Sequence, residues 1–130
     1  MSTPSAPHLP VTIDSQQQFN QTVASHDFIV VLFTAKWCAP CQTFYPNFAE
    51  VAAQAPQALF AVADIDVATD LASNFQVAQV PALMVIRQRV VIDMVTGAMH
   101  PHELQHHLAM WQALDMTAID AHFTQTSASA

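Results

Sequence analysis

The sequence is poor in positive charge. Lys36, Arg87 and Arg89 are its only lysine and arginine residues, against ten acidic ones, and the formal net charge with neutral histidines is −7. Nucleic acids and anionic membrane surfaces are bound through clustered Lys and Arg side chains. The composition therefore argues against both kinds of partner.

The chain also lacks a long apolar run and has only two cysteines, Cys38 and Cys41. No stretch approaches the roughly 18 apolar residues of a membrane span, so the hydrophobic content of 52% indicates a buried core. Two cysteines are too few for the disulfide framework of a small secreted protein. The first ten residues contain no Lys or Arg and no apolar stretch, so we expect no export signal. The expected location is a reducing compartment, the cytoplasm.

A length of 130 residues is typical of one domain. We predict a disordered Pro- and Ser-rich lead-in over 1–9, the domain over 10–114, and a C-terminal extension over 115–130. Within that extension, Met116–Phe123 has apolar residues at helical spacing and predicts a short helix before a disordered tail. Packing of this helix on the domain, extension of the preceding helix and contact with a partner all stay open.

Apolar, β-branched runs and helical periodicities alternate along the chain. Strands are predicted over Phe28–Thr34, Ala58–Ile65, Ala82–Ile86 and Val90–Val95, with a short one around Val11–Ile13. Helices are predicted from Ser15, over Cys38–Gln54 with a kink at Pro46, over Ala68–Phe75, and from Pro101. The order β-α-β-α-β-α-β-β-α predicts an α/β fold with a mixed sheet between two layers of helices. The last two strands form a hairpin through Arg87–Arg89, which lacks the Gly or Asn that would define its turn.

Cys38 and Cys41 stand where a buried strand passes into a helix. Free N–H groups and the helix dipole at that point favour the thiolate of Cys38, and Cys41 lies one turn further in, more sheltered. Such a pair suits a two-step exchange, in which an open sulfur attacks a disulfide and its neighbour resolves the intermediate. Two other interpretations stay open: a structural disulfide across a very small loop, and half of a metal site. The only further candidate metal ligands of note are histidines near the last helix: His100, His102, His106 and His107.

The sequence WCAPC (37–41) resembles the active-site motif of the thioredoxin family, with Ala39 in place of a glycine. Three further landmarks agree with this resemblance: Pro46 inside the following helix, Val80–Pro81 before a strand, and Gly97 sixteen residues after Pro81. The resemblance covers about Val11 to Trp111 and implies the thioredoxin fold, a central mixed sheet with helices on both faces.

The resemblance also implies roles. Cys38 is the expected nucleophile and Cys41 the resolving thiol, with no metal and no cofactor. The groove that holds the extended backbone of a client is expected to be lined by Trp37, Ala39, Pro40, Val80, Pro81, Gly97 and Ala98. A cis Val80–Pro81 bond would expose the main-chain groups of Val80 to that client. The implied partners are protein clients with disulfides and a recharging reductase of the thioredoxin-reductase type, and the chain is expected to be a monomer or weak dimer.

The chain departs from the family beneath the cysteines. Thioredoxins typically carry a buried acid six positions before the first cysteine and a lysine on the next strand, and here these positions hold Leu32 and Val62. Because both charges are lost together, the fold should tolerate the change. An apolar floor disfavours the Cys41 thiolate, so we expect slow resolution near neutral pH that speeds up as the pH rises. Asp64, on the same strand face as Val62, is a candidate substitute acid.

The function expected from these residues is that of a thiol–disulfide oxidoreductase that reduces protein disulfides. An alternative is a thioredoxin-fold binding or assembly module with secondary or weak redox activity, since a fold does not fix a function. A third option, an oxidase or isomerase, requires an oxidising compartment.

Overall fold

The structure is a computed structural model that describes residues 9–117. Its strands are β1 (Val11–Thr12), β2 (Phe28–Thr34), β3 (Leu59–Asp64), β4 (Ala82–Arg87) and β5 (Val90–Thr96). Its helices are α1 (Gln16–Ser25), α2 (Ala39–Ala53), α3 (Thr69–Asn74) and α4 (Pro101–Ala113). The predicted order of elements is confirmed. The predicted disordered ends and the helix over Met116–Phe123 fall largely outside the described residues.

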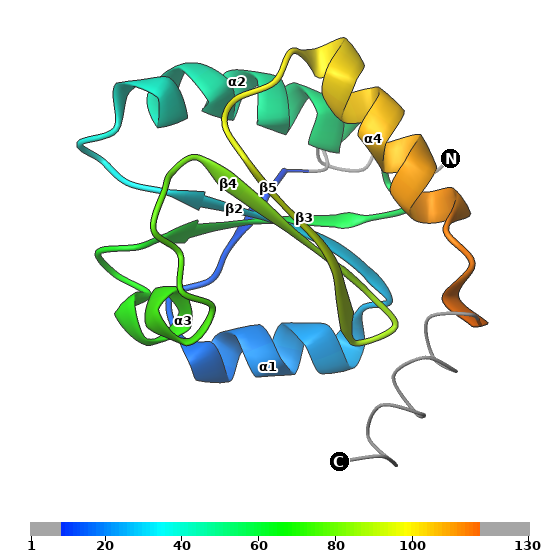
Figure 1. The fold of residues 1–130 in the computed structure, drawn as a ribbon, viewed down its shortest axis with the longest axis horizontal. Helices are drawn as coiled ribbons and strands as arrows, with labels where there is room; N and C mark the ends of the chain where they lie inside the picture. Colours follow the sequence, from blue (N-terminus) through cyan, green and yellow to red (C-terminus); the bar gives the residue numbers. More distant parts are fainter. Residues whose placement is uncertain (1–8, 118–130) are drawn as a thin grey trace, which may run out of the picture.

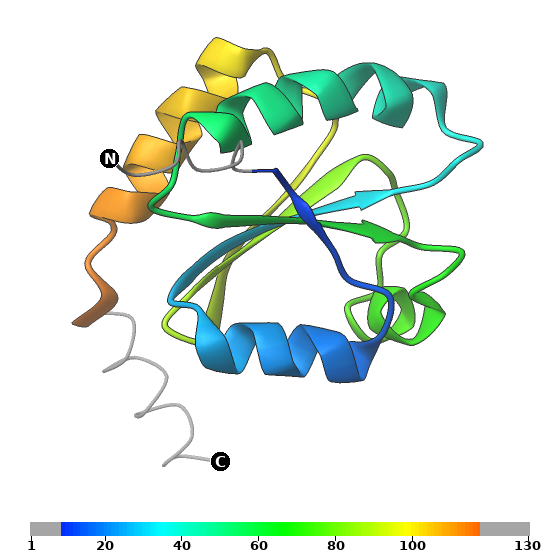
Figure 2. The ribbon, with the colours of Figure 1, turned by 180° about the vertical axis from the view of Figure 1, so that it is seen from behind.

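The strands form one twisted sheet in the order β1-β3-β2-β4-β5 (Figures 1 and 2). β3 runs parallel to β1 and β2, whereas β4 is antiparallel to β2 and to β5. The sheet is therefore mixed, as predicted. β2 is its central strand, so the chain segment that follows β2 leaves from the middle of the sheet.

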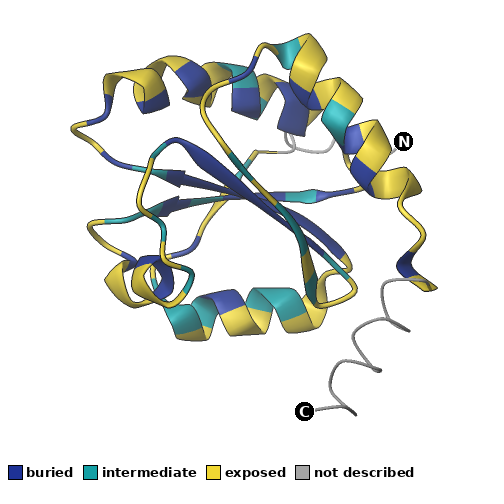
Figure 3. Ribbon diagram, in the orientation of Figure 1, coloured by how far each residue is buried: buried dark blue, intermediate teal, exposed yellow. Residues whose placement is uncertain are grey.

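Helices cover both faces of the sheet, with α2 and α4 on one side and α1 and α3 on the other (Figure 1). In β2, Val30 and Leu32 pack into the cluster beneath α2 and α4, and Val31 and Phe33 pack into the opposite one. All four side chains are fully buried. A continuous apolar run thus forms a strand that is covered on both faces, and Figure 3 shows the buried strands between helices whose outer faces are exposed.

The β4–β5 hairpin has a tighter turn than predicted. β4 extends to Arg87, so the turn is made by Gln88 and Arg89 alone, with φ of 50° and 68°. Positive φ at both central positions is characteristic of a type I′ turn, whose twist matches that of the flanking strands. No residue type predicted this turn, because neither position is Gly, Asn or Asp.

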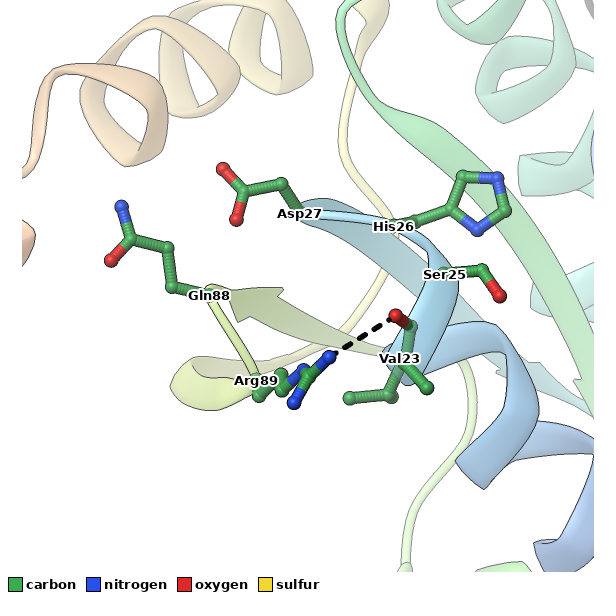
Figure 4. Close-up of a pocket in the computed structure, with 7 residues that line it drawn as sticks. Val23, Ser25, His26, Asp27, Gln88 and Arg89 are labelled. Carbon is green, nitrogen blue, oxygen red and sulfur yellow. Dashed lines mark hydrogen bonds between the residues drawn. The ribbon is translucent and has the colours of Figure 1, made fainter.

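Two arginines of this hairpin, Arg87 at the end of β4 and Arg89 in the turn, contact the C-terminal ends of two helices. Arg87 donates hydrogen bonds from Nη1 to the carbonyl oxygens of Trp111 and Gln112, at 2.9 and 2.8 Å. On the other side, Arg89 donates from Nη2 to the carbonyl oxygen of Ala24 near the end of α1, at 3.3 Å (Figure 4). Carbonyl groups at a helix C-terminus lack partners within the helix. A guanidinium there stabilises the helix, because it donates hydrogen bonds to these carbonyls and its positive charge interacts favourably with the negative end of the helix dipole. The hairpin tip thereby joins the two helical layers.

The remaining helix signals are partly confirmed. Ser15 caps α1, with its Oγ accepting a hydrogen bond from the N–H of Gln18. Gln18 does not complete a capping box, in which its side chain would accept the N–H of Ser15, because its Oε1 accepts from the N–H of Asp14 instead. Pro46 lies inside α2, and its kink stays a prediction. Within residues 9–117, no helix has the length and apolar character needed to cross a bilayer.

Candidate active site

Cys38 and Cys41 form a disulfide at the start of α2. Cys38 is the N-cap of that helix, and its Sγ accepts a hydrogen bond from the main-chain N–H of Cys41, at 3.1 Å. The Cα atoms of the two residues are 5.2 Å apart. The sulfur of Cys38 therefore sits at the positive end of the helix dipole, the position that favours a thiolate after reduction.

Both cysteines are buried, and Cys38 is the more exposed of the two, as predicted. Cys41 is fully buried, whereas the residue Cys38 is 5% exposed. Cys38 was expected to be open to solvent, and the structure shows it to be much less exposed than that. Ala35 is buried beside the disulfide, and Ile65 and Val80 pack against it.

The Val80–Pro81 loop and Gly97 lie beside the disulfide. The Val80–Pro81 bond is cis, as the family resemblance implied, and the carbonyl oxygen of Val80 lies 3.7 Å from Cys38 Sγ. Gly97 adopts a φ of +97° and donates its N–H to the carbonyl oxygen of Pro81, at 2.8 Å. Val80 is half-buried, while Pro81 is buried. The structure thus brings together residues that are far apart in the sequence.

Trp37 is the most exposed large apolar side chain of residues 9–117, with 68% of its surface accessible. Its indole Nε1 donates a hydrogen bond to Asp66 Oδ2, at 2.9 Å, in the segment that follows β3. Ala39, Pro40 and Ala98, the other predicted groove residues, are exposed. All the residues predicted to line the groove are therefore found at this end of the sheet.

The described residues place no ionisable side chain in the core beneath the disulfide. Leu32 is fully buried and is the register partner of Val62, which packs against the same apolar cluster. Residues 9–117 contain no buried polar or charged side chain. Asp64, the candidate substitute acid, accepts a hydrogen bond on Oδ1 from the N–H of Asp66 at 2.8 Å, so that oxygen is already engaged in its own turn.

The histidines near α4 do not assemble a metal site in the described part of the chain, where no group of three or more His, Cys, Asp and Glu side chains is placed to hold an ion. His107 makes a hydrogen bond between Nδ1 and the carbonyl oxygen of Glu103, at 2.8 Å, and its ring lies 5.4 Å from that of Trp111. His102 and His106 are exposed. These side chains belong to the surface of the helix.

Sequence reasoning missed three residues that surround the disulfide. Asp66 holds the exposed indole, and Ile65 packs against the sulfurs. Gln42 donates from Nε2 to the carbonyl oxygen of Ala35, at 3.0 Å, and that oxygen also accepts the N–H of Cys38. The first two directly follow β3, whose C-terminal end lies at the same edge of the sheet as that of β2, and this topological argument would have found them.

Comparisons with known proteins agree with this geometry. The family model for thioredoxin matches residues 10–110. Thioredoxin H7 of Arabidopsis thaliana is 35% identical over 98 residues, covering 72% of this chain and 75% of the relative. Thioredoxin H1 of the same plant is 34% identical over 93 residues, covering 72% and 81%.

Solved structures give the same result. The N21Q mutant thioredoxin from Halobacterium salinarum NRC-1 superposes with a TM-score of 0.77 at 26% identity, covering 87% of this chain and 99% of that one. Thioredoxin from Trypanosoma brucei brucei gives a TM-score of 0.74 at 28% identity, covering 84% and 96%. With the disulfide at the start of α2, these matches show that the chain belongs to the thioredoxin family and is a thiol–disulfide oxidoreductase.

Proposed function

We propose that the chain reduces disulfides of protein clients, with Cys38 as the nucleophile and Cys41 as the resolving thiol. In the reduced protein, the Cys38 thiolate attacks one sulfur of the client disulfide. A bond forms between Cys38 Sγ and that sulfur, the client S–S bond breaks, and the other client sulfur leaves as a thiolate and takes up a proton. The product of this step is a mixed disulfide.

Cys41 then completes the transfer. It loses its proton, and its thiolate attacks Cys38 Sγ, so that the Cys38–Cys41 bond forms and the second client sulfur leaves as a thiolate. Two electrons have passed from the cysteine pair to the client. Thioredoxins are recharged by a reductase, and we propose that an enzyme of the thioredoxin-reductase type supplies two electrons to this disulfide.

The proposed client groove is bounded by Trp37 on one side and by Val80, Gly97 and Ala98 on the other. A client cysteine that bonds to Cys38 must come within contact distance of Val80, because the Val80 carbonyl oxygen lies 3.7 Å from the attacking sulfur. An extended client segment can pair there with the Val80 main chain, as peptides do at exposed strand edges. The exposed ring of Trp37 offers apolar contact opposite.

The observation that best supports these roles is that the two cysteines differ in their position on α2 and in their exposure. Cys38 caps the helix, accepts the Cys41 N–H and retains access to solvent, whereas Cys41 is fully buried. A nucleophile needs a stabilised thiolate and an approach path, and only Cys38 has both.

Reduction of insulin, followed by turbidity with dithiothreitol as the electron source, tests the proposal. We expect the wild-type protein to accelerate precipitation, and Cys38→Ser and Cys41→Ser to remove the acceleration. A Cys38→Ser variant that retains the wild-type rate would contradict the catalytic role of Cys38 and favour a binding module.

A further inference from the structure

A second groove opens on the other side of the Val80–Pro81 loop, between β5 and the segment that follows α3. Its volume is about 230 Å³. This groove, here named the β5 groove, is lined by Phe75, Gln76, Val77, Ala78, Gln79, Ala82, Met94 and Thr96. None of these side chains is charged. The β5 groove plays no part in the cycle described above.

The β5 groove exists because α3 is too short to cover the edge of the sheet. α3 ends at Asn74, and Gln76 then adopts a left-handed conformation with a φ of 53°. The N–H of Gln76 bonds the carbonyl of Ser73 and the N–H of Val77 bonds that of Ala72, which is the Schellman pattern of a helix C-terminus. After this change of direction the chain continues into the Val80–Pro81 loop.

β5 is consequently left partly bare. Met94 is the register partner of Met84 and faces the same side of the sheet. Met84 is fully buried by the helices on that side, yet Met94 is 39% exposed because β5 is the last strand of the sheet. An exposed methionine beside half-buried Phe75 and Val77 makes an apolar, adaptable surface.

The walls of the β5 groove lead along the chain to the residues beside the disulfide. Gln79, on its wall, directly precedes Val80, whose carbonyl oxygen lies 3.7 Å from Cys38 Sγ. Thr96, at its other wall, directly precedes Gly97, which bonds the carbonyl of Pro81. A client chain that leaves the sulfur of Cys38 across this loop reaches the groove within a few residues.

We propose that the β5 groove is a specificity subsite, which receives an apolar side chain of the protein client located within about four residues of its reacting cysteine. This inference rests on the proposed function, because the client is held at Cys38. The uncharged lining selects apolar over charged or amide side chains, since burying an unpaired polar group in such a surface costs free energy. The exposed amides of Gln76 and Gln79 at the rim can bond the client main chain on either side of that anchor.

The test uses synthetic peptides that each carry one cysteine in a disulfide with a chromogenic thiol. Leu is placed in turn at each of the four positions on either side of the cysteine and compared with Asn, which has a similar shape. A small aromatic disulfide without a peptide, 5,5′-dithiobis(2-nitrobenzoic acid), reports the chemistry at Cys38 alone. We expect kcat/KM to be about tenfold higher for Leu than for Asn at one position.

Two matched variants locate the effect. Met94→Gln changes the β5 groove, and Met110→Gln makes the same change at an exposed methionine of α4. We expect Met94→Gln to reduce the preference for Leu to threefold or less, Met110→Gln to keep it, and all three proteins to reduce the small disulfide equally. Absence of a preference at every position, or a preference that persists in Met94→Gln, would overturn the subsite. Failure of wild type to reduce even the small disulfide would instead overturn the proposed function on which the subsite rests.

Discussion

The N–H of Gly97 donates a hydrogen bond to the carbonyl oxygen of Pro81, at 2.8 Å, and joins the end of β5 to the loop that contacts the catalytic sulfur. Gly97 is the only glycine of the chain and has a φ of +97°. Within residues 9–117, the other residues with positive φ are Gln76, Gln88 and Arg89, none of which is glycine. The single glycine is thus found where the backbone shapes the proposed client groove.

Replacing Gly97 with Ala should destabilise the protein through the backbone alone. A Cβ at this position would meet no atom within 4 Å, so a steric clash with neighbouring residues is not expected. The left-handed conformation costs a residue with a Cβ about 1 kcal/mol or more. Urea denaturation should show this loss in the free energy of unfolding.

The reverse change provides the control for Gly97. Gln76→Gly introduces glycine at a residue that already has a φ of 53°, and we expect a gain of up to about 1 kcal/mol. Equal stability of Gly97→Ala and wild type would show that the left-handed backbone at Gly97 carries no cost.

Arg87 is expected to contribute more to stability than its neighbour across the turn. It donates hydrogen bonds to the carbonyls of Trp111 and Gln112, and its guanidinium lies 5.6 Å from the centre of the Phe28 ring. We expect Arg87→Met to lower the free energy of unfolding by about 1–2 kcal/mol. Arg89→Met removes one exposed hydrogen bond of 3.3 Å and should change the free energy of unfolding by less than about 0.5 kcal/mol. Equal losses in the two variants would refute the role of Arg87 in holding α4.

Asp70 links α3 to the start of α1 and should make the stability depend on pH in acid. Hydrogen bonds from the N–H groups of Gln16 and Leu71 lower the pKa of the Asp70 carboxyl below its ordinary value. The stabilisation is present above the pKa of the unfolded state, about 4, and is lost as the pH falls through the lower folded value.

Thermal denaturation between pH 6 and pH 2.5 measures this effect. The Tm of Asp70→Asn should lie furthest below that of wild type near neutral pH and closest to it at the acid end of the range. Asp27→Asn, at an exposed carboxylate on the other side of the protein, is the control. A constant difference between Asp70→Asn and wild type across the range would contradict the assignment.

Resolution by Cys41 should accelerate as the pH rises through neutrality. Cys41 is fully buried, and the pair beneath the active site is apolar, Leu32 against Val62. Without a buried carboxylate beside it to accept its proton, formation of the Cys41 thiolate depends on hydroxide or buffer. In single-turnover measurements on a protein disulfide, the mixed disulfide should therefore decay faster as the pH is raised.

A double variant, Leu32→Asp with Val62→Lys, places an acid and a base on register partners of β2 and β3. It should flatten the pH profile and raise the rate near neutral pH, whereas Leu32→Asn with Val62→Lys should not. A wild-type rate that is already independent of pH around neutrality would reject the need for an acid.

The sequence was sufficient to predict the order of elements and most of the site. The apolar run Phe28–Thr34 forms a strand covered on both faces, as its pattern predicted. Which distant residues meet at the site was implied by the resemblance of WCAPC, Val80–Pro81 and Gly97 to the thioredoxin family, and not by residue types alone.

Other features were beyond reach because the usual residue types are missing. Gln76 and Gln88 adopt left-handed conformations without being Gly or Asn, so the end of α3 and the type of hairpin turn carried no signal. The 5% exposure of Cys38 depends on how Ile65 and Val80 pack around it. The β5 groove likewise depends on where α3 stops relative to the edge of the sheet.

The central claim, that Cys38 attacks and Cys41 resolves, is tested most directly by the mass of the intermediate. Reduced Cys41→Ser protein is mixed with native insulin, whose disulfides are intact. The mixture is quenched with acid and analysed by intact mass spectrometry. We predict that most of the Cys41→Ser protein gains the mass of one whole insulin molecule, whose chains stay joined by their second interchain disulfide, and that reduced Cys38→Ser protein under the same conditions gains almost none. An adduct of equal yield on Cys38→Ser, or none on Cys41→Ser, would contradict the claim.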